Sequence, residues 1–176
     1  MKTLSPHPAE CIRCFVDKKG AEIEIRPLRL GDEELLGDFY LNLSDETIYS
    51  FYNFCANKTA LVKKETLVRM CDEKNGLRLA AIYKGKIIGV GGLLGYFCPE
   101  EVCEIAYLVS DKYQKRGIGS VLMEMLIDYA TKCRSEGWIY AQTSLCNAGS
   151  KKLLKKFGFE VKCIGDWGIE WLYKVR

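Results

Sequence analysis

The spacing of apolar positions changes several times along the chain, and each change separates predicted strands from predicted helices. Near the N-terminus, two short apolar runs flank a Lys- and Gly-containing turn, which predicts a hairpin over about residues 11–26. Three short segments with helical spacing follow, and they begin near residues 33, 45 and 63. Alternating apolar positions then predict three strands, at 77–83, 86–95 and 102–109.

The longest helical pattern begins near Ser120, and its polar residues form a single stripe. That stripe comprises Ser120, Glu124, Asp128, Thr131 and Ser135. Most other positions there are apolar, so we expect this helix to pack against a sheet. Farther along, the pattern predicts a strand at 138–143, a helix at 148–157 and two short strands at 159–164 and 169–175. Meanders that give way to alternation with helices imply an α/β (mixed α+β) fold, with helices on both faces of a mixed sheet.

The composition of the chain is that of an ordinary globular protein, and it argues against a nucleic-acid-binding or membrane protein. With 176 residues, a net charge of +3 and 48% hydrophobic residues, we expect a single domain over 1–176. Basic residues are balanced by acids rather than clustered, which argues against a nucleic-acid partner. No segment has the length of a transmembrane span, and residues 1–8 lack the apolar run of a signal peptide. We therefore expect a cytoplasmic protein with no membrane partner.

The nine cysteines and the single histidine argue against a metal site and against histidine-based catalysis. Cys11 and Cys14 form a lone C-x-x-C pair, and no second close pair completes a zinc site. His7 stands in a proline-rich lead, where neither a Ser-His-Asp nor a Cys-His arrangement is expected. We expect no metal, and thiols that stay reduced.

The residues 114–119, Gln-Lys-Arg-Gly-Ile-Gly, join a predicted strand to the long helix. Backbone N–H groups at such a junction converge, and the helix N-terminus adds partial positive charge, so the site suits a phosphate or pyrophosphate. Gly117 and Gly119 permit close approach of a ligand, and Lys115 and Arg116 add formal charge. A tight turn without a ligand would show the same pattern. A Walker loop and a dinucleotide fingerprint both fit poorly, since the lysine of the first and the third glycine of the second are missing.

The loop and a second block of residues together resemble the GCN5-related N-acetyltransferase (GNAT) superfamily. The loop matches at Gln114, Gly117 and Gly119, and the second block runs from Asn147 to the ending Phe157-Gly158-Phe159. The resemblance implies a central mixed, mostly antiparallel sheet of about seven strands, flanked by four to five helices. It also implies an acetyl-CoA-binding core over about 78–160, with acetyl-CoA as the co-substrate.

The same resemblance implies how acetyl-CoA is held. The pyrophosphate would lie on the loop and the first helical turn, which comprise Gln114, Lys115, Arg116, Gly117, Ile118, Gly119 and Ser120. The superfamily commonly opens a bulge in the preceding strand, which would expose backbone atoms of Leu108 and Val109 to the thioester and the pantetheine arm. Asn147 would reach the pantetheine arm.

A narrower resemblance, to the stand-alone Pat-type protein lysine acetyltransferases, covers nearly the whole chain. It rests on the opening segment, on Leu43-Ser44-Asp45-Glu46-Thr47, and on Cys103-Glu104-Ile105-Ala106. It implies that Glu104 is the general base and that a lysine ε-amine of a protein, such as an acyl-CoA synthetase, attacks directly in a ternary complex. A glutamate on a strand that simply faces water is the alternative interpretation of Glu104.

One departure from the superfamily pattern leaves other functions open. Many members carry a tyrosine acid at the position of Leu154. Its loss is compatible with a non-catalytic acetyl-CoA-binding regulator, while acetylation of a small amine or a protein N-terminus would use the same fold. Cys146 adjoins Asn147, and we interpret it as a buried structural thiol rather than a nucleophile. The sequence does not distinguish a monomer from a homodimer.

Overall fold

The computed structural model describes residues 12–52, 56–94, 102–133 and 137–175, which build one eight-stranded sheet in the order β1-β2-β3-β4-β5-β6-β8-β7. The strands are β1 (Arg13–Val16), β2 (Glu22–Pro27), β3 (Leu77–Tyr83), β4 (Lys86–Leu94), β5 (Val102–Val109), β6 (Gly137–Thr143), β7 (Glu160–Gly165) and β8 (Gly168–Val175). Only the β5–β6 pair is parallel, and all other neighbours are antiparallel. The predicted mixed, mostly antiparallel sheet is confirmed, with eight strands rather than about seven.

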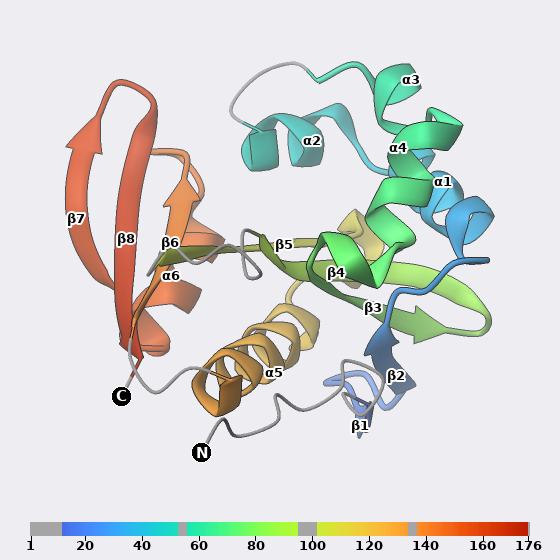
Figure 1. Cartoon of the computed structure of the whole chain (residues 1–176), viewed down its shortest axis with the longest axis horizontal. Coiled ribbons are helices and arrows are strands. Elements are labelled where there is room, and N and C mark those ends of the chain that lie inside the picture. Colours follow the sequence, from blue (N-terminus) through green and yellow to red (C-terminus); the bar gives the residue numbers. More distant parts are fainter. Residues whose placement is uncertain (1–11, 53–55, 95–101, 134–136, 176) are drawn as a thin grey trace.

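Six α-helices accompany the sheet in the described part of the chain. They are α1 (Glu33–Leu41), α2 (Asp45–Tyr52), α3 (Lys58–Leu61), α4 (Lys64–Cys71), α5 (Ile118–Cys133) and α6 (Ala148–Lys156). The sequence pattern missed only α3, which is a single turn. Figure 1 shows α1 to α4 on one side of the sheet and α5 on the other. None of the helices in the described ranges is long and apolar enough to cross a membrane.

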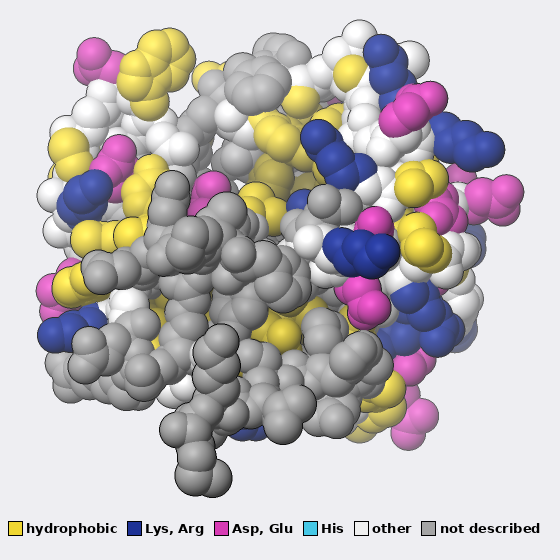
Figure 2. All heavy atoms as spheres, in the orientation of Figure 1, with side chains coloured by type: hydrophobic (Ala, Val, Ile, Leu, Met, Phe, Trp, Pro, Cys, Tyr) yellow, Lys and Arg dark blue, Asp and Glu magenta, His cyan; other side chains and the backbone are white. Residues whose placement is uncertain are grey.

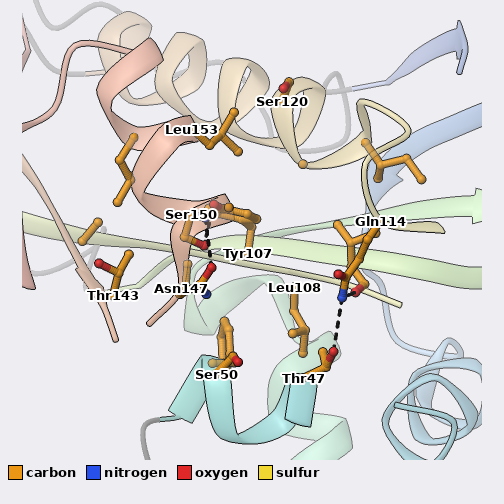
Figure 3. A pocket seen from close by; sticks show the side chains of 18 of the residues that line it. Thr47, Ser50, Tyr107, Leu108, Gln114, Ser120, Thr143, Asn147, Ser150 and Leu153 are labelled. Atoms are coloured by element: carbon orange, nitrogen blue, oxygen red, sulfur yellow. Dashed lines mark hydrogen bonds between the residues drawn. The ribbon is translucent and has the colours of Figure 1, made fainter. Parts of the chain in front are cut away.

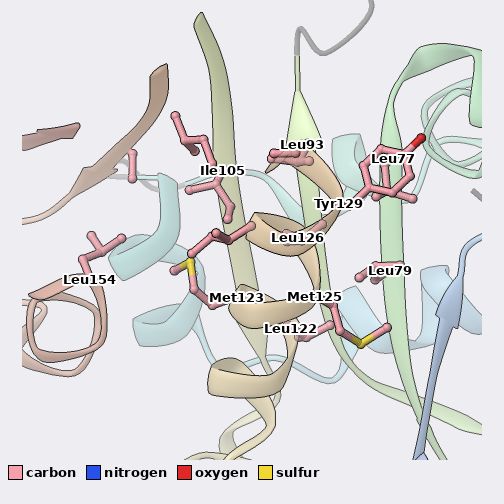
Figure 4. Packing of buried hydrophobic residues seen from close by; sticks show 14 of the residues in the cluster. Leu77, Leu79, Leu93, Ile105, Leu122, Met123, Met125, Leu126, Tyr129 and Leu154 are labelled. Carbon is pink, nitrogen blue, oxygen red and sulfur yellow. The ribbon is translucent and has the colours of Figure 1, made fainter. Parts of the chain in front are cut away.

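Helix α5 packs closely onto β3, β4 and β5, as its apolar pattern predicts. Leu122, Met123 and Leu126 have no exposed surface and lie against strand residues such as Leu79 (Figure 4). The helix can approach because β4 has a glycine beneath it. A Cβ built on Gly91 would lie only 3.1 Å from Cδ1 of Leu126. The first half of the sheet is therefore a tightly packed platform.

The opposite face of the sheet is covered over only part of its width. A second cluster, in which Leu36, Phe39 and Ile48 meet Ala80 and Leu108, fills the space between α1, α2, α4 and the strands β3 to β5. Strands β6, β8 and β7 lie outside this cover (Figure 1). The residues of β6 and β8 on that face are all at least partly exposed, and we call this set the open face: Trp138, Tyr140, Gln142, Glu170, Leu172 and Lys174.

The parallel pair β5–β6 is short, and its early end creates the main cleft. Val102 to Glu104 pair with Trp138 to Tyr140, and no pairing of the two strands extends past Glu104 in the described residues. Beyond that point, residues of both strands line one concavity. The cleft therefore lies at the boundary between the covered half of the sheet and the open face.

Candidate active site

The cleft has a volume of about 790 Å³. It is lined by β5, by the segment 113–120 apart from Arg116, by one side of α2, by the first turns of α6 and by the end of β6. Figure 3 shows side chains from these separate elements pointing into one space. Every predicted site residue except Arg116 lines this cleft: Glu104, Leu108, Val109, Gln114, Lys115, Gly117, Ile118, Gly119, Ser120 and Asn147. The tertiary structure thus brings together residues that are far apart in the sequence.

The loop before α5 has the backbone shape of an anion cradle. Lys115 and Gly117 both have positive φ, at 60° and 98°, and such alternation makes successive N–H groups converge. The N–H groups of Ile118 and Gly119 have no intrahelical acceptor at the start of a helix. Ser120 differs, because its N–H donates to the carbonyl oxygen of Gly117 at 3.0 Å. The groups best placed for a pyrophosphate are therefore those before Ser120.

The side chain of Arg116 has a partner other than the cleft. Its guanidinium forms an ion pair with Asp17, in the β1–β2 turn, and lies 5.0 Å from the ring centroid of Tyr113. Only 12% of the Arg116 side chain is exposed. Of the two cations predicted for the pyrophosphate, Lys115 lines the cleft and Arg116 does not. Sequence spacing could not show this, because the competing carboxylate comes from the other end of the chain.

Backbone direction along β5 decides which groups can face the cleft. The N–H of Ser110 donates to Ile88 of β4 at 2.9 Å, and antiparallel pairing alternates, so the N–H of Leu108 also points toward β4. The backbone groups of Tyr107 and Val109 point the other way, toward the gap left by β6. The β4–β5 register is continuous from Val109 to Glu104. The prediction of a bulge in β5 is therefore wrong. The gap between β5 and β6 arises because the pairing of these two strands ends at Glu104.

Gln114 and Asp111 tie helix α2 to the end of β5. The Gln114 amide donates to Thr47 Oγ1 at 3.2 Å and to the Val109 carbonyl oxygen at 3.1 Å. The Asp111 carboxylate accepts from the Ser44 hydroxyl and the Thr47 hydroxyl, both at 2.6 Å. Gln114 therefore serves as a structural bridge in this structure, drawn in Figure 3, rather than pointing at the anion cradle.

Glu104 lies where the covered half of the sheet ends. Its neighbours Cys103 and Ile105 are buried toward α5, so Glu104 points to the opposite face. The side chain reaches solvent, yet the walls of the cleft remove part of its hydration, and this desolvation raises the pKa of Glu104 above its ordinary value. Glu104 is therefore a better proton acceptor near neutral pH than an ordinary surface glutamate.

A tyrosine and a second carboxylate of the open face lie near Glu104. Tyr140 is the register partner of Glu104 across the parallel pair. The pKa of Tyr140 is raised by burial, and further by the nearby carboxylates of Glu170 and Glu104. Two acidic groups therefore lie close to Tyr140, where they favour a cationic group such as an ammonium.

The N-terminus of α6 forms another wall of the cleft. Asn147 caps this helix by accepting from the N–H of Ser150 at 3.0 Å, which leaves its amide nitrogen as the group that can donate to a ligand. The hydroxyl of Tyr107 donates to Ser150 Oγ at 2.8 Å, and burial raises the pKa of Tyr107 to about 12. Tyr107 was not singled out from the sequence, although its place on the strand beside Glu104 was the available signal.

Two further sequence interpretations meet different outcomes. The side chain of Leu154 is 1% exposed and packs in the hydrophobic core. Because leucine has no hydroxyl, this position supplies no proton donor. The interpretation of Cys146 as a buried thiol is wrong, because this residue is exposed at the cleft, with its Sγ 3.4 Å from Ser144 Oγ. In the described part of the chain, no group of three or more His, Cys, Asp or Glu side chains could hold a metal ion.

The chemistry of the cleft fits coenzyme A. The molecule needs an elongated site with a pyrophosphate cradle at one end and free strand groups for its amides. Such groups all line this one cleft: the cradle before α5, the backbone of Tyr107 and Val109, and Asn147 with its amide nitrogen. When bound, acetyl-CoA would supply an activated acetyl group to this cleft, which Glu104 also lines.

Comparisons with known proteins agree with this geometry. Residues 45–159 match the model of the acetyltransferase (GNAT) family. The chain is similar to "Acetyltransferase PA5475" of Pseudomonas aeruginosa, with 28% identity over 144 residues, which covers 80% of this chain and 76% of that protein. Among solved structures, the GNAT domain of S. lividans PAT matches with a TM-score of 0.81 and 23% identity, over 96% of this chain and 99% of that one.

A second solved structure contains a coenzyme A derivative. Mycobacterium smegmatis RimJ in complex with CoA-disulfide matches with a TM-score of 0.70 and 15% identity, over 93% of this chain and 86% of that one. These likenesses support the fold, and the family model covers well over half of the chain. The protein therefore belongs to the GNAT family and is an acetyl-CoA-dependent acetyltransferase.

Proposed function

We propose that this protein transfers the acetyl group of acetyl-CoA to a lysine ε-amine of another protein, such as an acyl-CoA synthetase. The observation that carries the proposal is the position of Glu104, which stands in the cleft at the edge of the open face with a raised pKa. A carboxylate there can receive a proton from an ammonium group that approaches across β6 and β8.

The chemistry requires such a base. Lysine has a reference pKa about 3.4 units above neutrality, so its free amine costs roughly 4–5 kcal/mol to populate at pH 7. In the proposed reaction Glu104 takes one proton from the ammonium group, and the free amine attacks the thioester carbon directly in the ternary complex. As the amide bond forms, the C–S bond breaks and coenzyme A leaves as a thiolate, which the second proton lost from the amine nitrogen neutralises. The N–H of Val109, which faces the gap, donates to the developing oxyanion. Orientation in one complex replaces a covalent intermediate on the enzyme.

The open face supports a protein acceptor over a small amine. It continues from Tyr140 to Trp138, which is 38% exposed, and the ammonium of Lys174 lies 5.9 Å from the Trp138 ring. Figure 2 shows hydrophobic side chains between the β7–β8 hairpin and α2, the side from which an acceptor would enter. A broad surface of this kind suits a loop of a folded protein. None of the described cysteines forms a disulfide, which fits the proposed cytoplasmic location.

The test is incubation with acetyl-CoA and an acyl-CoA synthetase, followed by mass spectrometry of the acceptor. The expected product carries acetyl groups on lysine side chains. Unmodified lysines together with measurable binding of acetyl-CoA would favour the regulatory alternative, and acetyl groups confined to protein N-termini or to free amines would favour the other two.

The role of Glu104 is tested by Glu104→Gln, with Glu170→Gln as the matched control on β8, two strands away in the sheet. General-base catalysis contributes about 10²–10⁴-fold, so we expect at least a hundredfold lower rate for Glu104→Gln near pH 7, with unchanged affinity for acetyl-CoA. The difference in rate between Glu104→Gln and wild type should shrink as the pH approaches the pKa of the acceptor lysine, because the free amine is then populated without a base. An equal loss in both variants would remove Glu104 as the base and leave only a shared electrostatic effect.

A further inference from the structure

The turn between β1 and β2 is rigid and is attached to the cofactor loop. Oδ1 of Asp17 accepts from the N–H of Lys19 at 2.8 Å and from the N–H of Ala21 at 3.0 Å, and Gly20 closes the turn with a φ of 80°. Because the backbone of the turn is held in this way, the positions of Lys18 and Lys19 are set by the hairpin rather than by a free loop.

Two contacts join this turn to Arg116. The buried carboxylate of Asp17 pairs with the Arg116 guanidinium, and the N–H of Lys18 donates to the carbonyl oxygen of Arg116 at 3.2 Å. Burial alone would raise the pKa of Asp17, but the ion pair and the backbone donors outweigh it, so the pKa lies below its ordinary value. Asp17 is therefore ionised at neutral pH, and the attachment persists.

Because of these contacts, the cleft is lined by Lys18 and not by Arg116. Arg116 turns away to meet Asp17, while Lys18 is brought to the wall of the cleft. Among the described residues that line the cleft, Lys18 and Lys115 are the only ones with a positive charge. Lys19 follows Lys18 in the same turn and is exposed as well, but it does not line the cleft. Lys18 and Lys19 therefore have the same charge and similar exposure, but only Lys18 lines the cleft.

We propose that Lys18 is a phosphate-binding residue of the acetyl-CoA site, held there by the Asp17–Arg116 pair. Coenzyme A carries a pyrophosphate and a separate 3′-phosphate, and both suit an ammonium donor. The proposal rests on acetyl-CoA as co-substrate and not on the identity of the acceptor. A hairpin that precedes the matched family segment thus contributes directly to recognition of the co-substrate.

The experiment measures coenzyme A binding by calorimetry, without any acceptor, for Lys18→Ala and the matched control Lys19→Ala. Loss of a charged contact predicts roughly tenfold weaker binding for Lys18→Ala and less than about a twofold change for Lys19→Ala. The dependence of binding on salt should also become less steep for Lys18→Ala alone. Equal affinities for the two variants would overturn the proposal. Both residues are exposed, so both variants are expected to fold.

Binding of dephospho-coenzyme A distinguishes the two phosphate sources. If Lys18 meets the 3′-phosphate, wild type and Lys18→Ala should bind this ligand equally. If it meets the pyrophosphate, the tenfold difference should persist. A thermodynamic cycle with Asp17→Ala tests the attachment, because Lys18→Ala should have a smaller effect once the turn is released. Since no acceptor is present, failure of the lysine-acetylation hypothesis would leave these results unchanged.

Discussion

The two halves of the sheet differ in how they are covered, and the difference explains where the chemistry lies. In β3 and β4 most residues are buried, because helices pack on both faces. All six residues of β7 are exposed, and β6 and β8 are covered on one face only. The covered half supplies a tightly packed frame for the loop before α5, and the uncovered half presents the surface at which we propose that the acceptor binds. Glu104 lies at the boundary between them.

The comparison extends to the carboxylates on each side. Asp111 and Asp32 lie within hydrogen-bond networks, and although burial alone would raise their pKa, the donors around them hold it below its ordinary value. None of the described residues donates a hydrogen bond to Glu104, and desolvation raises its pKa. The structural carboxylates are thus stabilised as anions, while the carboxylate in the cleft is suited to exchange a proton.

The largest expected effect concerns core packing in the covered half. Leu126→Ala should destabilise the protein by about 2–5 kcal/mol, because the surroundings of this fully buried side chain cannot collapse into the cavity. Val161→Ala, on exposed β7, should change stability by less than about 0.5 kcal/mol. Urea unfolding measures both. Similar losses would show that β7 is covered in solution.

Adding a methyl group should also destabilise the covered half of the sheet more than β7, but by a smaller free energy than the Leu126→Ala substitution. Gly91→Ala places a Cβ 3.1 Å from the buried Leu126, and such overpacking should cost about 1–3 kcal/mol. Gly165→Ala, on β7, meets nothing within 4 Å and should be neutral or slightly stabilising. Thermal unfolding of the two variants provides the comparison, and a neutral Gly91→Ala would mean that α5 can shift away from β4.

Asp111→Asn should cost about 1 kcal/mol at pH 7, because the carboxylate accepts hydrogen bonds from Ser44 and Thr47. The folded-state pKa of Asp111 is below its unfolded value, so its contribution is present above the unfolded pKa and is lost as the pH falls through the folded pKa. The difference between variant and wild type should therefore vanish in acid. The exposed Asp166 supplies the control, Asp166→Asn, for which no such difference is expected.

Glu104→Gln should have the smallest effect on stability, and its sign should be opposite. Because the folded-state pKa of Glu104 is raised, the ionised form is disfavoured in the folded protein, and this cost appears as the pH rises through that pKa. We expect the variant to be more stable than wild type at pH 7 by less than about 0.5 kcal/mol, and equal to it at low pH. A less stable variant at pH 7 would indicate an undetected partner for the carboxylate.

Most of the fold was accessible from the sequence, since periodicity reports which face of an element is buried. The hairpin, the strands at 77–83 and 86–94, and the long helix all occur within a few residues of their predicted positions. Helix α3 escaped prediction because one turn carries too little periodicity. The buried Leu154 and the exposed Cys146 depended on how α6 and the loop before it lie against the sheet.

The sequence by itself determined the elements, the glycine loop and the candidate base, because these follow from local spacing and from motifs that are continuous along the chain. Only the tertiary structure decided the directions of the side chains. Arg116 turns to Asp17, Gln114 turns to Thr47, and Lys18 reaches the cleft in place of Arg116. A charged or polar side chain takes the best partner within reach, and in a folded chain that partner comes from a distant segment whose position no local pattern contains.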